Sequence, residues 1–245
     1  MINKKLDFVN TEQLDEIDHL RKKMIKFDGK HTAGNLAGPG KKNKSYYSPV
    51  VGMHNKVDIK KSDIINQDII DIVFKGKSSE YINDHITAGY YGILDSRITE
   101  YNEGDEYDWH LDFVLSSTGI SRGIIQTNKL SFTLFLNDTK EYEGGELCID
   151  INGEIKRFKE KKGTIVIYPS DKLHKVTKIT KGIRQVLIGW IYCPFKDPAD
   201  RYVLCKSQQA LNILLEHSKK NPEFKEALRS FWQLRQAFEK KSLSQ

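Results

Sequence analysis

Three residues in the chain have types that suit a metal site. His110 and Asp112 form an H-x-D pair in the segment YDWHLDF, and His174 directly follows the segment IYPSDKL. Two imidazoles and one carboxylate on one face of an octahedral ion are the ligand set typical of non-haem Fe(II), and they leave three positions open. These residues therefore predict a metal centre of the kind found in oxygenases, although the same set also binds Zn, Mn or Ni.

A strand pattern around these residues predicts that they meet. Residues i and i+2 of a strand point to one face, so His110 and Asp112 converge. His174 begins another strand, and we expect the TKG segment at residues 180–182 to join it to the last strand as a tight hairpin. Residues of matching parity in a hairpin share a face, so the side chains of Arg184 and His174 are expected to point into the same barrel.

Arg184 is a candidate for binding a co-substrate. A buried arginine needs a partner, and a planar guanidinium binds a carboxylate through two parallel hydrogen bonds. We expect that partner to be either a carboxylate-bearing co-substrate or an internal Asp or Glu.

The composition is that of an ordinary globular protein. The chain has 245 residues, of which 38% are hydrophobic and 29% charged, and its net charge is +6. This length is enough for a real hydrophobic core. A basic surface favours nucleic acid or anionic partners, but the lysines are scattered and no helix-turn-helix, zinc-finger or aromatic-interleaved pattern occurs. The pattern therefore does not favour a nucleic-acid partner.

The sequence also predicts a cytoplasmic protein without a membrane segment. No apolar run approaches the roughly 18 residues that span a bilayer, and the first residues lack the apolar core of a secretion signal. The three cysteines, Cys148, Cys193 and Cys205, have no metal-type spacing. Cys148 and Cys193 fall in apolar strand-like runs, and we expect packed thiols, as in a reducing compartment.

The hydrophobic period divides the chain into three regions. Residues 1–92 have the period of helices and are expected to form a helical support region, with a Gly-rich loop at residues 29–48. Residues 93–195 change to the period of strands without helices between them, which predicts a sandwich or jelly-roll barrel. Residues 196–245 return to helical spacing.

Local signals define the expected elements. Asn10 or Thr11 is expected to cap a first helix, Asn152-Gly153 predicts a two-residue hairpin, and residues 114–129 are the expected crossover or substrate loop. The predicted strands are 93–101, 107–113, 130–137, 145–151, 154–159, 163–169, 174–180 and 183–193.

The C-terminal region carries an apolar stripe at helical spacing. We expect this stripe to pack on the barrel, with a homodimer through the C-terminal helices as the alternative. Its members are Leu228, Phe231, Trp232, Leu234, Arg235 and Phe238.

The motifs together resemble a known family. Tyr101, the H-x-D pair, LSFTLFLND, YEGGEL, YPS, LHKVTKITKGIR and Trp190 occur in an order similar to that of the Fe(II)- and 2-oxoglutarate-dependent dioxygenases. The likeness is to the prolyl and lysyl hydroxylase branch, and within it to the bacterial PKHD-type hydroxylases. It covers nearly the whole chain, because FVNTEQLDEI, DGKHTAGNLAG and the C-terminal helices also match. It implies an α+β protein, mainly β, whose double-stranded β-helix (jelly-roll, cupin-like) core has N-terminal and C-terminal helices. Gly144 and Gly145 are implied to shape the backbone.

The resemblance also implies roles for single residues. His110, Asp112 and His174 match the iron ligands, Arg184 matches the residue that binds the distal carboxylate of 2-oxoglutarate, and Tyr101 matches a tyrosine that helps to hold it. The implied cofactor is Fe(II), with 2-oxoglutarate and O2 as co-substrates and ascorbate as a candidate reductant. No side chain beyond the metal ligands needs to be catalytic, because the cofactor carries the chemistry.

The implied reaction is hydroxylation of a C–H bond, coupled to conversion of 2-oxoglutarate to succinate and CO2. A protein side chain, with proline first, is the expected substrate, and a small molecule is the alternative. Tyr107 and Trp190 are candidate substrate contacts. Collagen-type prolyl hydroxylases usually carry lysine at the position of Arg184, which argues against a collagen-like substrate.

Two other functions remain open at this stage. A non-catalytic, cupin-like metal-binding protein would use the same ligands but has no need of Arg184. A nucleic-acid demethylase of the same superfamily would usually carry a second arginine shortly after Arg184, and residues 185–190 contain none.

Overall fold

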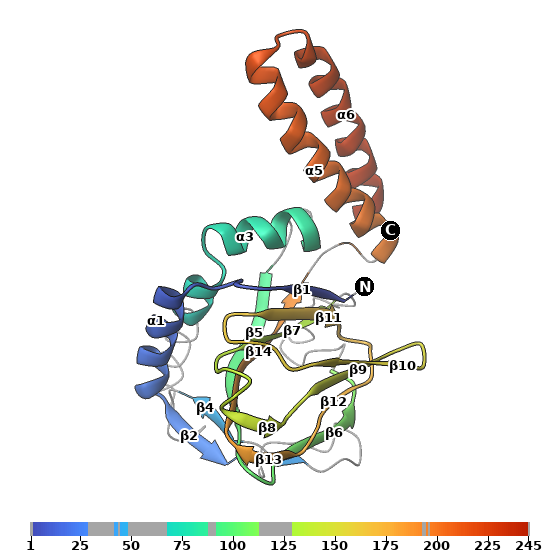
Figure 1. Ribbon diagram of the computed structural model, residues 1–245. Helices are drawn as coiled ribbons and strands as arrows, with labels where there is room; N and C mark the ends of the chain where they lie inside the picture. Colours follow the sequence, from blue (N-terminus) through green and yellow to red (C-terminus); the bar gives the residue numbers. More distant parts are fainter. Residues whose placement is uncertain are drawn as a thin grey trace, which may run out of the picture.

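The computed structural model is built around two antiparallel sheets, with helices near both ends of the chain (Figure 1). It describes residues 2–28, 42–43, 45–48, 68–87, 92–112, 129–192, 195 and 197–244. The expected class, mainly β with flanking N-terminal and C-terminal helices and a jelly-roll core, is confirmed.

The larger sheet has seven strands and carries most of the packing. In spatial order they are β1 (Asn3–Lys5), β11 (Ile165–Pro169), β7 (Lys129–Phe135), β14 (Arg184–Tyr192), β5 (Gly92–Tyr101), β4 (Ser45–Ser48) and β2 (Ile25–Asp28). The neighbouring strands are antiparallel.

The smaller sheet has five strands, and a two-stranded ribbon lies beside it. The five strands are β10 (Glu154–Phe158), β9 (Leu147–Ile151), β12 (His174–Val176), β6 (Glu106–His110) and β3 (Lys42–Asn43), in spatial order. The ribbon pairs β13 (Ile179–Gly182) with β8 (Tyr142–Gly144). At the β9–β10 turn, Asn152 and Gly153 both have positive φ, of 56° and 91°, which confirms the predicted hairpin.

The seven-stranded sheet is covered on both faces, as alternation along β14 shows. Leu187 and Ile191 face a core that includes Ile17 of the first helix. Val186 faces the other way, into a core shared with Ile149 of the five-stranded sheet. The site described below lies on this second face, between the two sheets.

Helices support the outer face of the larger sheet. Helix α1 (Thr11–Lys22) begins at Asn10, whose side chain accepts a hydrogen bond from the backbone of Gln13 at 2.9 Å, while the Gln13 side chain accepts one from the backbone of Asn10. This reciprocal capping box fixes the start of the helix where the sequence predicted it. Residues 68–73 are also helical, and α3 (Lys77–Ile82) continues into a π-helical segment, η2 (Asn83–Thr87).

Part of the predicted loop at residues 29–48 is not a loop. Residues 42–43 and 45–48 form β3 and β4, which add a strand to each sheet. The residues of β3 and β4 show no alternation of apolar and polar types in the sequence. Their extended conformation therefore depends on pairing with β6 and β5. Residues 29–41 lie outside the described part of the chain.

The C-terminal helices α5 (Pro198–Lys220) and α6 (Phe224–Leu243) form an antiparallel hairpin that projects from the barrel (Figure 1). The prediction that the α6 stripe packs on the barrel is wrong for part of it, since Trp232 is 48% exposed and Leu234 71% exposed. Phe238 instead packs near Phe195 and Leu204. Among the described helices, none is long and apolar enough to cross a membrane.

Candidate metal and 2-oxoglutarate site

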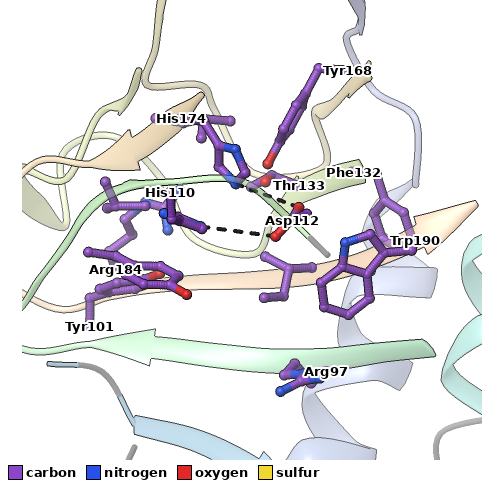
Figure 2. Close-up of a pocket in the computed structure, with 15 residues that line it drawn as sticks. Arg97, Tyr101, His110, Asp112, Phe132, Thr133, Tyr168, His174, Arg184 and Trp190 are labelled. Atoms are coloured by element: carbon purple, nitrogen blue, oxygen red, sulfur yellow. Dashed lines mark ion pairs between the residues drawn. The ribbon is translucent and has the colours of Figure 1, made fainter. Parts of the chain in front are cut away.

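His110 and His174 are neighbours because their strands are paired. His110 ends β6, His174 begins β12, and the two residues are direct partners across the antiparallel pair. Their ring centroids are 4.1 Å apart. Asp112 follows two residues after His110, and one potential ligand atom from each of the three side chains lies within 4.8 Å of the others. Figure 2 shows the carboxylate beside the two imidazoles. The predicted set of three is therefore brought together.

Each imidazole is oriented by a backbone carbonyl two residues earlier in the chain. The Nδ1 atom of His110 lies 2.7 Å from the carbonyl oxygen of Asp108, and that of His174 lies 2.9 Å from the carbonyl oxygen of Lys172. A carbonyl only accepts, so Nδ1 carries the proton and donates in both rings. In the neutral rings Nε2 is then left with a lone pair for a metal ion, which is the usual support of histidine ligands.

The carboxylate of Asp112 is held in its charged form. Burial acts to raise its pKa, but attraction by His174, a hydrogen bond from Ser131 and attraction by His110 outweigh burial and lower the pKa. The Asp112 oxygens lie 4.0 Å from Nε2 of His110 and 3.5 Å from Nε2 of His174. An anionic oxygen beside two imidazole nitrogens is a donor set that fits Fe(II).

These three side chains line a cavity of about 110 Å³ between the sheets. Strand β14 contributes Arg184 and Trp190 to its lining, and β5 contributes Tyr101 opposite Arg184. The other lining residues are Arg97, Tyr107, Phe132, Thr133, Leu147, Tyr168, Val176, Ile188 and Gly189. Burial, followed by repulsion from Asp112, raises the pKa of Tyr107 to about 12, so this phenol is neutral at physiological pH.

Arg184 is buried, and no described residue provides a counter-charge for it. It is 1% exposed, and its Nε and Nη2 atoms have no hydrogen-bond partner in the part of the chain that the structure describes. Within the described ranges no carboxylate lies in ion-pair distance of it; the rings of Tyr101 and Phe135 lie 5.2 and 5.4 Å from its guanidinium carbon. The alternative of an internal Asp or Glu partner therefore finds no support among the described residues. Burying an unpaired cation is costly, which favours an anionic ligand at this end of the cavity.

Gly145 makes room for the Arg184 side chain. Its φ is +65°, and a Cβ atom there would lie 2.9 Å from Cδ of Arg184 and would overlap Cδ1 of Ile179. The second glycine of YEGGEL is thus required both by its left-handed backbone and by its contact with the arginine.

Comparison with known proteins gives the family. The sequence profile of the 2OG-Fe(II) oxygenase superfamily matches residues 96–192. A PKHD-type hydroxylase of Prochlorococcus marinus is 38% identical over 178 residues, which is 72% of this chain and 71% of the relative. A PKHD-type hydroxylase of Gloeothece citriformis is 31% identical over 212 residues, covering 86% and 87% of the two chains. The chain belongs to the PKHD-type hydroxylases.

The fold of this PKHD-type hydroxylase agrees with that assignment. A crystal structure of an oxidoreductase of the 2OG-Fe(II) oxygenase family from Burkholderia pseudomallei superposes with a TM-score of 0.56 at 15% identity, covering 78% of this chain and 85% of that chain. This likeness supports the fold. With the family, it makes the protein a 2-oxoglutarate-dependent non-haem iron dioxygenase, which uses Fe(II), 2-oxoglutarate and O2.

One prediction about the site is wrong. His174 and Arg184 are not in a hairpin, because β12 pairs with β6 and β9 whereas β14 pairs with β5 and β7. The chain leaves β12 at Thr177, which forms two hydrogen bonds with Glu146. The Thr177 N–H donates to the Glu146 carbonyl, and the Thr177 hydroxyl oxygen accepts from the Glu146 N–H. Residues 179–182 then pair with β8. His174 and Arg184 therefore reach the same cavity from different sheets.

Two further residues at the site were not predicted from the sequence. Ser131 and Ser170 form a hydrogen-bonded pair behind Asp112. Ser170 belongs to the YPS motif, which contributed to the family resemblance but assigned no role to the serine. Ser131 lies in the LSFTLFLND motif, where nothing distinguished it from its neighbours. The predicted substrate contacts Tyr107 and Trp190 both line the cavity. Most of the expected substrate loop, residues 114–129, lies outside the described residues.

Proposed function

We propose that His110, Asp112 and His174 bind Fe(II) in this PKHD-type hydroxylase, and that Arg184 binds the distal carboxylate of 2-oxoglutarate. The observation that carries the proposal is a buried guanidinium that has no ion pair with any described residue, in the same cavity as a two-histidine, one-carboxylate set. A protein that only stores metal has no use for such a cation. The neutral phenol of Tyr101, which lies beside Arg184, is proposed to help hold the co-substrate.

The side chains bind and orient, and no acid–base or nucleophilic group is required. When bound, the iron supplies the oxidative chemistry that couples conversion of 2-oxoglutarate to succinate and CO2 with hydroxylation of a C–H bond. The backbone bonds to His110 and His174 fix the two rings. The apolar wall, which includes Ile188 and Phe132, limits access of water to the reacting centre.

The proposed substrate is a protein side chain, with proline first. This proposal is supported by the likeness to the prolyl hydroxylase branch and by two aromatic residues, Tyr107 and Trp190, that offer flat apolar surfaces in the cavity. We further propose that ascorbate keeps the iron reduced and that the protein is cytoplasmic. The buried thiol of Cys148, which forms no disulfide with any described residue, supports that location.

The decisive experiment measures metal and co-substrate together. Purified protein loaded anaerobically with Fe(II) is expected to develop a visible charge-transfer band when 2-oxoglutarate is added. Proline-containing peptides and a small-molecule cell extract are then incubated separately with O2, with and without ascorbate, and analysed by mass spectrometry. A one-oxygen mass gain on proline is expected. Absence of the band would overturn the iron proposal, and product only in the small-molecule fraction would overturn the prolyl substrate.

Replacing Gly145 with alanine is expected to weaken 2-oxoglutarate binding about tenfold, because the new methyl group pushes Arg184 out of place. The matched control is Gly153→Ala, which also substitutes a glycine of positive φ (+91°) but has no atom within 4 Å of the new Cβ. The control is expected to lose stability, by about 1–2 kcal/mol, without a change in affinity. Calorimetric titration distinguishes the two, and equal affinities in both variants would contradict the role of Gly145.

A further inference from the structure

Asp112 is positioned differently from the two histidines. His110 and His174 belong to paired strands, so their places are fixed by the ladder of the five-stranded sheet. Asp112 lies two residues beyond the end of β6 and belongs to no described strand. Its carboxylate therefore needs support from side chains, and that support comes from the opposite sheet.

Ser131 on β7 provides the closest contact. Its hydroxyl donates a hydrogen bond of 2.5 Å to Oδ2 of Asp112, and its Oγ lies 2.8 Å from Oγ of Ser170. Because the single proton of Ser131 goes to the carboxylate, Ser170 must donate to Ser131. Ser131 is 1% exposed and Ser170 2% exposed, so bulk water does not compete for these bonds.

Trp190 approaches the same carboxylate from the neighbouring strand. It is the direct partner of Ser131 across the β7–β14 pair, so both side chains point to the same face of the sheet. The indole Nε1 atom is buried and has no hydrogen-bond partner by distance and angle among the described residues, and Figure 2 shows it directed toward Asp112. Two directly paired residues of the seven-stranded sheet thus direct donors toward the carboxylate that follows β6.

Ser170 connects this support to the second histidine. It directly follows β11, in the turn that leads to His174. The same turn provides the Lys172 carbonyl that accepts from the His174 ring. A single turn therefore orients one proposed ligand by its backbone and another through a chain of two hydroxyls.

We propose that Ser131 and Ser170 are positioning residues that hold Oδ2 of Asp112, so that the carboxylate binds iron through one oxygen and leaves room for the co-substrate. This inference rests on the proposed function, because it takes Asp112 as an iron ligand. A carboxylate without this restraint could turn and bind through both oxygens, which would occupy a position that 2-oxoglutarate or O2 needs. The bonded partners of metal ligands commonly affect metal affinity in this way.

The test compares Ser131→Ala and Ser170→Ala with the wild-type protein. Anaerobic calorimetry is expected to show Fe(II) affinity reduced roughly 10–100-fold in Ser131→Ala. A loss of about threefold is expected in Ser170→Ala, which keeps the bond to Asp112 but lacks the cooperating donor. The charge-transfer band with 2-oxoglutarate is expected to lose intensity or shift in Ser131→Ala, even at saturating Fe(II). A role in folding alone would not alter that band.

Ser78→Ala is the matched control, since Ser78 is also a buried serine whose hydroxyl is hydrogen-bonded, to the carbonyl of Phe8, but it does not line the cavity. Its Fe(II) affinity and band are expected to equal those of the wild type. Wild-type affinity and an unchanged band in both Ser131→Ala and Ser170→Ala would overturn the inference alone. A wild-type protein that binds no Fe(II) would instead overturn the proposed function and the inference with it.

Discussion

Replacing His174 with alanine is expected to reduce Fe(II) affinity by about 100-fold or more and to abolish succinate formation. The substitution removes one of three donor atoms that lie within 4.8 Å of one another, and loss of a direct ligand costs more than loss of its hydrogen-bonded support. Anaerobic calorimetry measures the affinity, and succinate release without added substrate measures turnover.

The control for this prediction is His217→Ala, on the exposed surface of α5. It is expected to leave both measurements unchanged. Iron binding and turnover at wild-type levels in His174→Ala would show that His174 is a packed core histidine and not a ligand. A loss confined to turnover, with normal iron affinity, would contradict the ligand role as well.

Replacing Arg184 with leucine is expected to separate ligand binding from folding. It removes the proposed bidentate, charge-assisted contact, so 2-oxoglutarate affinity is expected to fall roughly 100-fold or more. The free protein is expected to unfold at the same temperature as the wild type or higher, because an apolar side chain replaces a buried cation that has no ion pair with any described residue. The stabilisation that 2-oxoglutarate gives the wild type should disappear.

Two further variants sharpen this test. Arg184→Lys keeps the charge but not the planar fork, so an intermediate affinity is expected. Arg157→Leu removes an arginine whose 2.8 Å ion pair with Glu146 is largely exposed, and it should leave binding unchanged. If Arg184→Leu bound 2-oxoglutarate normally but unfolded at a much lower temperature, the arginine would be a structural residue.

Much of the β core was predictable because apolar and polar residues alternate along its strands and typical turn residues separate them. Strands β5, β7, β10, β11 and β14 fall within about two residues of their predicted bounds. Asn152-Gly153 and the Asn10 cap act locally, so their effects can be read from neighbouring letters alone. β3 and β4 were missed because pairing with distant strands determines them.

The sequence predicted which residues meet in the cavity, but not which strand pairs bring them together. The residue types of His110, Asp112 and His174 are those of a metal-binding set, whereas their mutual geometry depends on strand pairs far apart in the sequence. The false hairpin between His174 and Arg184 shows this, since a short TKG segment gives no sign that the chain crosses to another sheet. The contact between Ser131 and Asp112 likewise joins two sheets, and no local pattern encodes it.

The division of the site between two sheets has a consequence for selectivity among dicarboxylic acids. Two of the proposed iron ligands, His110 and His174, lie on the five-stranded sheet, and Arg184 lies on the seven-stranded sheet. In these roles, the spacing between the sheets works as a molecular ruler: an acid must be long enough to touch both walls and short enough to fit between them. A keto acid one methylene shorter or longer could contact either the proposed iron site or Arg184, but not both. The packing between the sheets would therefore decide which keto acid the enzyme accepts.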